Sequence, residues 1–408
     1  MTALRIAVLC PHFAPDNAPT GEVMTRIVSE LTDLGHRVDV VTALPWYREH
    51  RIEPGWTGRW VRRERTSWGS ITRVHPFPGN DRTNLLRRAI GFAGFSALTA
   101  VASWPGGKVD AVIAMSPPLT MGMTGWTTHV VRRGPLVFNV QDIFPDAAVE
   151  TGAITNRHII AVASWLERLS YRRAAAVTVL SDDLRDNVAA KLSPKRRGRV
   201  HVIPNFVDTT FIQPGDRMTP YRTEHGIGDQ AVVMYAGNVG FSQSLELLLA
   251  AAAQMPQVTF VINGDGAARA SLQQQAAHLA NVRFVGYQPK ERLPEVLASA
   301  DLHVVPLRTG LGNVSVPSKT YSILAAGRPV LASIDADTEV PRMIQASGAG
   351  LVVSPDNPDA FIDGLRSLLA DRAALAAMGA AGRTFVQHAA SPRAVALAYV
   401  RLIEQGAL

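Results

Sequence analysis

Cysteine is almost absent from this chain of 408 residues, which contains only Cys10. A disulfide framework is therefore excluded, and a reducing compartment is the expected setting. Charged residues make up only 18% and hydrophobic residues 47%, a composition typical of a folded globular protein rather than a disordered one. The chain is too long for one core and predicts two domains of roughly 200 residues each.

Long apolar runs are also missing. The best candidate is "NLLRRAIGFAGFSALTAVASW", residues 84–104, whose uncharged part is shorter than the about 20 residues that a membrane-spanning helix needs. We expect a buried helix of an α/β domain, or a helix lying in a membrane interface with Arg87 and Arg88 at its polar end. The first ten residues show no basic leader and no cleavage site, so we expect no signal peptide.

Several motifs of known chemistry are absent as well. The sequence contains no H-E-x-x-H, no Cys/His cluster and no G-x-S-x-G. We therefore predict no protein metal site and no serine hydrolase. Basic motifs interleaved with aromatic residues are missing too, which disfavours nucleic-acid binding.

Positive charge is concentrated in one segment. The net charge is +7, and residues 48–88 contain ten arginines against four acidic residues, which accounts for nearly the whole excess. Such a segment is either a solvated basic loop or a surface for anionic lipid or another polyanion.

Short apolar, β-branched runs alternate with segments of helical length from end to end, as in "RIAVLC" followed by the amphipathic residues 22–34. This alternation predicts an α/β fold with two doubly wound, Rossmann-like domains in tandem. We place the N-terminal domain at residues 1–192, a Pro-, Gly- and charge-rich linker at 193–212, and the C-terminal domain at 213–390. Residues 391–408 are expected to form a helix that packs back on the N-terminal domain. Because open α/β sheets bind ligands beyond the carboxyl ends of their strands, two such domains facing a cleft suit transfer of a group between two ligands.

Glycine-containing loops follow several of the predicted strands. The loop "PHFAPDNAPTGEV" leads into a helix at Gly21 and either presents amides to a phosphate or is an ordinary connection; it is not a G-x-G-x-x-G dinucleotide motif. In the second half, "MYAGNVGFSQSLELLL" places Gly237 and Gly240 in the same kind of turn, where glycine allows a ligand close to the backbone. Gly264 and Gly266 are expected to serve turn geometry.

Lys319 lies in the stretch "VPSKTYSILAAG", where a helix is predicted to begin. Pro317 suits a first helical turn and Ser318 can cap its amides. A cation is electrostatically disfavoured at a helix N-terminus, so Lys319 is explained either by a diphosphate sharing the site or by a side chain that extends into solvent. In the first half, Gln141 and Asp142 follow the predicted strand "LVFNV", the position where an open sheet holds its ligand, although Asp142 could also cap the next turn.

Taken in order, these segments resemble a family. "RVHVIPNFVDTTFIQP" is similar to the linker signature I-P-N-G-V-D-x-x-x-F-x-P of the GT-B glycosyltransferases of family 4, and "VVMYAGNVG", "FVINGDG", "VRFVGY" and "PSKTYSILAAGRPVLAS" follow in the family's order and spacing. The likeness covers nearly the whole chain. It is strongest to the bacterial polysaccharide branch, which carries "QD-x-x-P" and "VPSK-x-Y" and includes fucosamine and colanic-acid transferases.

The resemblance implies a retaining transfer of a hexosyl or N-acetylhexosaminyl group from a nucleotide-diphosphate sugar, such as a UDP-sugar. The donor would lie in the C-terminal domain and the acceptor in the N-terminal domain. Neither a cofactor nor a metal is implied, because cationic side chains and amides stabilise the departing diphosphate.

The sequence departs from the family pattern at the diphosphate. Asn238 and Gln243 stand where the family's G-R-L-x-x-x-K motif has its Arg and Lys, so Lys319 becomes the leading candidate for the missing charge and Arg308 a weaker one. The family's E-x7-E motif falls on Val314 and Ser322, which leaves the sugar to be recognised by backbone amides around residues 312–315 or by residues outside the family pattern. The family's H-D pair is Gln141-Asp142 here, and we place Asp142 and Lys319 at the catalytic centre. The remaining candidates are Gly312, Asn313, Ser315 and Ser318 for the donor, Gly286 and Tyr287 near the nucleobase, and Asp16 and Gln141 on the acceptor side.

The favoured function is transfer of a sugar to a lipid-linked or nascent cell-surface polysaccharide acceptor. The protein is then cytoplasmic, with peripheral attachment to the inner face of an anionic membrane through residues 48–104. Two alternatives stay open: a GT-B sugar-nucleotide epimerase or hydrolase, and a non-catalytic scaffold in a polysaccharide assembly complex.

Overall fold

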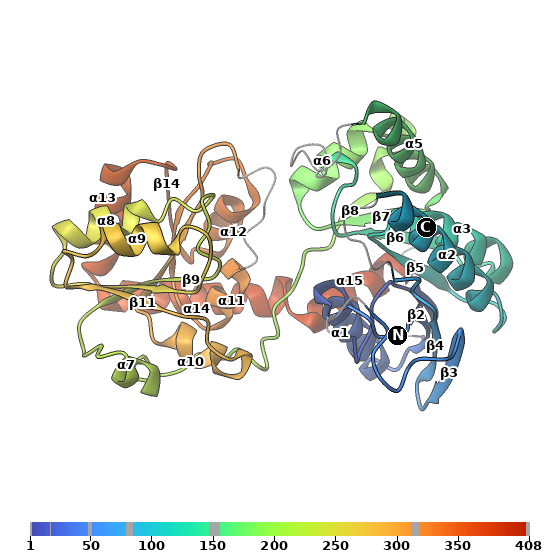
Figure 1. The fold of residues 1–408 in the computed structure, drawn as a ribbon, viewed down its shortest axis with the longest axis horizontal. Coiled ribbons are helices and arrows are strands. Elements are labelled where there is room, and N and C mark those ends of the chain that lie inside the picture. The colour runs from blue at the N-terminus through green and yellow to red at the C-terminus, as the bar shows by residue number, and fades with distance from the viewer. Residues whose placement is uncertain are drawn as a thin grey trace. The chain divides into compact units, whose positions relative to one another are not determined.

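A computed structural model of the chain describes residues 2–16, 18–47, 51–78, 85–146, 156–311 and 319–404. The chain forms two compact units (Figure 1). Unit 1 comprises Met1–Asn205 and Pro392–Leu408, and unit 2 comprises Phe206–Ser391. Each unit is a sheet, parallel apart from one edge strand of unit 1, with helices packed on it, which confirms the predicted α/β class.

Unit 1 contains an eight-stranded sheet in the order β3-β4-β2-β1-β5-β6-β7-β8. All neighbouring strands pair in parallel except β3 and β4, which form an antiparallel edge. Its central strands are buried along their whole length because helices cover both faces of the sheet, and they are correspondingly apolar. The strands are β1 (Arg5–Leu9), β2 (Arg37–Ala43), β3 (Val61–Thr66), β4 (Gly69–Val74), β5 (Ala111–Ser116), β6 (Leu136–Val140), β7 (Ala176–Val179) and β8 (Val200–Val202).

Two helical layers cover this sheet (Figure 1). Side chains from α2, α3, α5 and α6 share one core with the strands, including Phe95, Met121, Tyr171 and Val188. On the other face, α1 packs against the C-terminal helix α15, which therefore belongs to unit 1. The helices are α1 (Pro19–Asp33), α2 (Leu85–Ser103), α3 (Met121–Arg132), α5 (Arg157–Arg173), α6 (Asp182–Ala190), the 3-10 helix η1 (Pro194–Arg199) and α15 (Pro392–Glu404).

The middle of the basic segment forms the antiparallel hairpin β3–β4 rather than a loop. Part of its charge is structural, because Arg73 is buried, pairs with Glu64 at 3.3 Å and lies 5.0 Å over the ring of Trp56. Arg62 also stacks on Trp56, at 4.3 Å. Arg63 and Arg65 are exposed on β3, and Arg48, Arg82 and the side chains of Arg87 and Arg88 lie outside the described residues.

Unit 2 contains a parallel sheet of six strands in the order β11-β10-β9-β12-β13-β14. This order starts at two central strands and proceeds outward in both directions, the arrangement of a Rossmann fold. The strands are β9 (Val232–Ala236), β10 (Thr259–Asn263), β11 (Val282–Val285), β12 (Leu302–Pro306), β13 (Val330–Ser333) and β14 (Gly350–Val353). The helices are α7 (Pro220–Glu224), α8 (Glu246–Gln254), α9 (Arg269–Gln275), the 3-10 helix η2 (Lys290–Arg292), α10 (Leu293–Ala298), α11 (Lys319–Ala325), α12 (Glu339–Ser347), α13 (Pro358–Leu369) and α14 (Arg372–Ala389).

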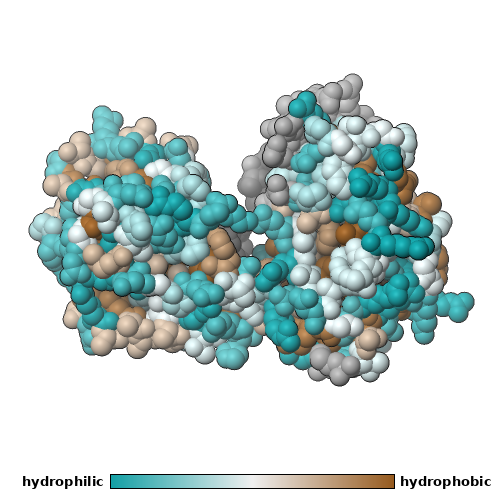
Figure 2. All heavy atoms as spheres, turned by 90° about the horizontal axis from the view of Figure 1, so that it is seen from below, coloured by the Kyte–Doolittle hydropathy of each residue, from teal (hydrophilic) through white to brown (hydrophobic). Residues whose placement is uncertain are grey.

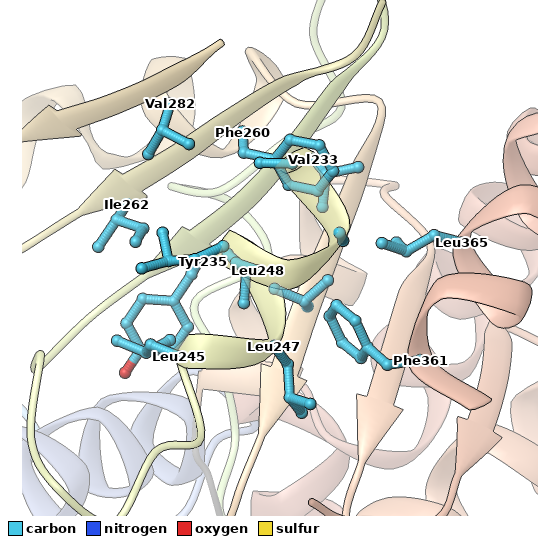
Figure 3. Packing of buried hydrophobic residues seen from close by; sticks show 14 of the residues in the cluster. Val233, Tyr235, Leu245, Leu247, Leu248, Phe260, Ile262, Val282, Phe361 and Leu365 are labelled. Carbon is cyan, nitrogen blue, oxygen red and sulfur yellow. The ribbon is translucent and has the colours of Figure 1, made fainter. Parts of the chain in front are cut away.

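One core of unit 2 packs α8 and α13 against the strands β9 and β10 (Figure 3). Leu245, Leu248 and Phe361 belong to this cluster together with the strand residues Val233 and Phe260. Tyr235 of β9 belongs to the same cluster, and Figure 3 shows its ring beside Leu245. The side chains of this cluster therefore hold the backbone of β9 in position.

The predicted linker is shorter in the structure than in the sequence analysis. Within residues 193–212, η1 and β8 belong to unit 1, and β8 pairs with β7 as the edge strand of its sheet. The chain leaves unit 1 at Asn205 and re-enters it at Pro392. The short length of β8 explains why a composition rich in proline and charge concealed it.

None of the helices within the described ranges has both the length and the apolar character of a membrane-crossing helix. On the face of the molecule shown in Figure 2, hydrophilic side chains predominate and hydrophobic ones form small patches.

Candidate functional site

The carboxyl ends of β9 and β12 define the candidate site of unit 2. These two strands are neighbours at the centre of the sheet, with Val233 paired to Leu302, and the chain leaves them in opposite directions toward β10 and β13. Ligands of open α/β sheets bind at such a reversal of strand order, outside the carboxyl ends. The segments that follow β9 and β12 are those in which the sequence predicted donor-binding residues.

Lys319 begins α11 and points to the carboxyl end of β9. Its Nζ donates a hydrogen bond to the hydroxyl of Tyr235 at 2.7 Å and lies 4.0 Å from the centroid of the same ring. Burial lowers the pKa of Lys319 to about 8, because an ammonium is poorly solvated there. Among the described residues, no carboxylate forms an ion pair with Lys319. A desolvated cation without a carboxylate partner is a favourable place for an anionic ligand.

Tyr235 holds this lysine from inside the core. Its hydroxyl donates to the carbonyl of Asn238 at 2.5 Å while it accepts from Lys319, so both of its roles are used. Gly237 lies beside both side chains with φ of 143°, and a Cβ there would lie 3.0 Å from Nζ of Lys319 and 3.6 Å from the Tyr235 hydroxyl. Glycine is therefore needed at position 237 both for the backbone conformation and for the close approach of the lysine.

Three amides of the loop after β9 already have acceptors within the protein. Gly237 N donates to Asn263 O and Val239 N to Asp265 O, each at 2.9 Å. Gly240 N donates to Oε1 of Gln243 at 3.0 Å. A phosphate that uses the Gly240 amide must therefore displace the Gln243 side chain, which leaves Lys319 as the more available positive group.

Arg308, the weaker sequence candidate for the diphosphate, is occupied by protein contacts. Its Nε donates to Phe241 O at 2.7 Å, and its guanidinium pairs with Glu246 at 3.1 Å and with Asp356 at 3.6 Å. These contacts link the segment after β12 to the loop after β9, to the start of α8 and to the segment after β14. A diphosphate that uses Arg308 would have to compete with these ion pairs.

The structure describes only some of the other donor candidates. Ser322 is half-buried in α11, one turn after Lys319. Gly286 and Tyr287 are exposed after β11 at the same edge of the sheet, and the Tyr287 hydroxyl donates to Asp265 O at 3.3 Å. Gly312, Asn313, Val314, Ser315 and Ser318 lie outside the described residues.

The candidate site of unit 1 follows β6. Gln141 is buried and its amide donates to Asn139 Oδ1 at 2.8 Å, while Asn139 donates to the Tyr399 hydroxyl of α15 at 2.8 Å. Asp142 next to it is exposed, yet desolvation by the surrounding chain raises the pKa of its carboxyl. The C-terminal helix therefore supports Gln141 through Asn139, and Asp142 provides the exposed carboxyl group of this site.

A second group in unit 1 lies in the loop after β1. Asp16 is buried, accepts from Tyr47 N at 3.0 Å and receives Nδ1 of His12 at 2.6 Å. His12 stacks on Trp46 with ring centroids 5.6 Å apart, and a Cβ on Gly21 would lie 2.8 Å from the His12 Cβ. Asp16 and Gly21 thus meet around His12, which the sequence analysis missed; its i, i+4 spacing to Asp16 was the available signal.

No group of three or more His, Cys, Asp and Glu side chains that could hold a metal ion occurs in the described part of the chain.

Two family patterns match this chain in succession. Residues 20–205 match the family described as "Glycosyl transferase 4-like domain", and residues 230–371 match "Glycosyl transferases group 1". The first match lies within unit 1 and the second within unit 2.

Individual proteins agree with this assignment. The chain is 24% identical over 380 residues to "Putative colanic acid biosynthesis glycosyl transferase WcaI" of Escherichia coli (strain K12), over 90% of this chain and 92% of that protein. Its fold resembles sucrose-phosphate synthase from Thermosynechococcus elongatus, with a TM-score of 0.71, 20% identity and 98% of both chains covered. It also resembles HepE from Anabaena, solved in complex with UDP and glucose, with a TM-score of 0.64, 16% identity, and 98% and 100% of the two chains covered. The chain therefore belongs to the family 4 glycosyltransferases of the GT-B fold, in the bacterial polysaccharide branch, and is an enzyme of sugar transfer in polysaccharide or glycoconjugate biosynthesis.

Proposed function

We propose that this protein transfers a hexosyl or N-acetylhexosaminyl group from a nucleoside diphosphate sugar to a lipid-linked or nascent polysaccharide acceptor, with retention of anomeric configuration. The observation that carries the donor part is Lys319, a desolvated ammonium at the reversal of strand order in unit 2. The binding of UDP by the structural relative HepE favours a uridine nucleotide. The relative named for colanic acid biosynthesis favours a cell-surface polysaccharide acceptor and a site of action at the inner face of a membrane.

The chemistry assigned to Lys319 follows from the leaving group. When the glycosidic bond to the diphosphate breaks, negative charge grows on the departing phosphate oxygen. A preorganised cation in a desolvated site stabilises this charge more strongly than water does. Tyr235 holds the ammonium in place without neutralising it, because a neutral phenol accepts the hydrogen bond. No metal ion is required for this step in the proposal.

Asp142 is proposed to act on the acceptor side. Its carboxyl lies after β6 in unit 1 and has a raised pKa, so it can exchange a proton closer to neutral pH than an ordinary aspartate. Gln141, Asp16 and His12 would hold the acceptor beside it. Gly21, in the first turn of α1, brings the amino end of this helix against His12 and Asp16.

A thermal-shift panel of nucleoside diphosphate sugars tests the donor. A ligand that binds the native state raises its midpoint of unfolding, so the correct donor should stand out from the others. Transfer is then measured with that donor and a polyprenyl-linked acceptor. Release of free sugar or of an epimer from the donor alone, with no transfer to any acceptor, would overturn the proposal in favour of a hydrolase or epimerase.

A further inference from the structure

Helix α5 carries large apolar side chains on its solvent side. Ile159, Val162 and Trp165 follow one another at intervals of three residues, and Val162 and Trp165 expose 64% and 63% of their surface. Exposed apolar residues scattered singly are ordinary, whereas a contiguous group on one element marks an interaction site.

The position of α5 in unit 1 explains this exposure. The first turn of α3 lies beside the last turn of α5: a Cβ on Gly122 would meet the Ser170 side chain at 2.4 Å, and Arg173 stacks over Trp126 at 4.4 Å. Because both helices run in the same direction, the first half of α5 extends beyond the start of α3 and is not covered by it (Figure 1).

The charges on α5 are of one sign. Its only carboxylate is Glu167, which is buried and receives Nζ of Lys191 at 2.7 Å and the hydroxyl of Tyr171 at 3.0 Å. The exposed charged side chains are all arginines, including Arg168 and Arg172, for which no ion pair is found among the described residues.

More cations adjoin the end of this helix. Arg196 of η1 donates to the carbonyl of Arg172 at 2.6 Å, which brings η1 against the last turn of α5. The exposed side chains that η1 adds are Lys195, Arg197 and Arg199. An apolar stripe that contains tryptophan and continues into arginines matches the interface of an anionic bilayer, where apolar groups enter the headgroup region and cations meet phosphates.

We propose that the α5 face, defined as Ile159, Val162, Trp165, Arg168 and Arg172, docks on an anionic phospholipid membrane. The inference rests on the proposed function, because a lipid-linked acceptor is carried by such a surface. It moves the membrane contact away from residues 48–104. Two arginines of the β3–β4 hairpin already have partners within the protein, since Arg73 pairs with Glu64 and Arg62 stacks on Trp56. The ring of Trp60 lies 5.5 Å from that of Phe77.

The hairpin supplies matched controls. Trp60 exposes 64% of its surface and Trp165 63%, so W60S and W165S remove the same exposed group from two places in unit 1. Likewise R63Q/R65Q on β3 and R168Q/R172Q on α5 remove the same charge from exposed arginines. Binding of the full chain is measured by co-sedimentation with vesicles of phosphatidylcholine alone or mixed with phosphatidylglycerol.

We expect binding only to the vesicles that contain phosphatidylglycerol, with weakening at high salt. W165S should lower this binding about tenfold, as for loss of one large buried apolar group. R168Q/R172Q should lower it about fivefold for each arginine. The two hairpin variants should bind as the unaltered protein does.

Three results would overturn the inference: no preference for anionic vesicles, losses in the hairpin variants that equal those in the α5 variants, or self-association in sedimentation velocity that W165S abolishes while vesicle binding stays unchanged. The donor thermal shift, measured on the same samples, separates this inference from the proposed function. Vesicle binding through α5 without a shift from any nucleotide sugar would overturn the function alone, and a clear donor shift without vesicle binding would overturn the membrane contact alone.

Discussion

The ammonium of Lys319 and the phenol of Tyr235 form one structural unit at the carboxyl end of β9. Nζ lies 2.7 Å from the hydroxyl oxygen and 4.0 Å from the ring centroid, so the same side chain offers the lysine both a hydrogen bond and a π face. Neither contact neutralises the charge. The site therefore keeps a positive group in a poorly solvated position, and an anionic ligand would remove the cost of holding it there.

Replacing Lys319 by methionine should lower kcat/KM for sugar transfer about 100-fold, because one preorganised donor to the leaving diphosphate is lost. The fold should be retained, since methionine fills much of the same space without a charge to desolvate. R308M is the control for the loss of a cation in the same unit. Because Arg308 pairs with Glu246 and Asp356, R308M should lower kcat/KM less than K319M does. Steady-state kinetics with circular dichroism checks the prediction, and normal turnover in K319M would remove Lys319 from the diphosphate site.

Donor affinity should depend on pH through the same lysine. Its pKa is about 8 in the folded protein against 10.5 in its ordinary state, so the ammonium is already charged below pH 8 and must take up a proton to meet a diphosphate above it. Affinity should be flat below pH 8 and fall by up to about tenfold per pH unit above it. Titration calorimetry measures this, and K319M should abolish the dependence.

The stability of the ligand-free protein should depend on pH in the opposite sense to the donor affinity. Because burial depresses the pKa of Lys319, its charge opposes folding fully below pH 8, and this cost fades as pH rises from 8 toward 10.5. K319M should therefore unfold at a higher temperature than the unaltered protein at pH 7, and the difference should shrink at alkaline pH. A constant difference across this range would mean that methionine acts through packing and not through charge.

Tyr235→Phe keeps the ring and removes the hydroxyl that contacts Lys319 and Asn238 O. We expect a several-fold rise in KM for the donor and a loss of about 1 kcal/mol in unfolding free energy, the usual value of a buried hydrogen bond. Tyr221→Phe is the matched control, because its hydroxyl donates to Asn263 Oδ1 at 2.8 Å in the same unit. It should lose similar stability with KM unchanged; equal changes in KM would show that Tyr235 acts only by supporting the fold.

The sequence predicted the fold well because its signals are local. Buried parallel strands are recognisable as short apolar runs, and helices begin and end close to the predicted residues, as for α1, which spans Pro19–Asp33 where residues 22–34 were expected. The prediction was weaker where structure depends on pairing. The strand β8 was assigned to the linker, because its three residues carry no pattern of their own apart from their partner β7.

The candidate site was predicted unevenly for the same reason. Lys319 stood out because a cation near a helix start conflicts with the helix dipole. Its partner Tyr235 lies 84 residues away within an ordinary buried strand, and nothing in that strand indicates an inward hydroxyl. The ion pairs of Arg308 also join residues far apart in the sequence. The sequence therefore indicated the arginine as a candidate but could not predict that it pairs with Glu246 and Asp356.

Asp142→Asn should separate donor binding from transfer. Loss of the carboxylate should lower transfer about 100-fold, within the usual range for a positioned acid or base, while the thermal shift caused by the donor stays the same. Because desolvation raises the pKa of Asp142, its charge opposes folding at neutral pH and ceases to do so as pH falls through the folded-state value toward 3.8. The variant should therefore be more stable than the unaltered protein at pH 7, and the gain should vanish in acid.

Asp146→Asn provides the comparison for this prediction, because Asp146 receives Nζ of Lys191 at 2.8 Å and Nδ2 of Asn187 at 3.1 Å. It should lower stability and leave transfer intact, the reverse of Asp142→Asn in both respects. Transfer by the Asp142 variant within a few-fold of the unaltered rate would mean that this carboxylate takes no part in the reaction. The acceptor would then have to be activated elsewhere in unit 1, and the His12–Asp16 pair is the arrangement there with the right chemistry.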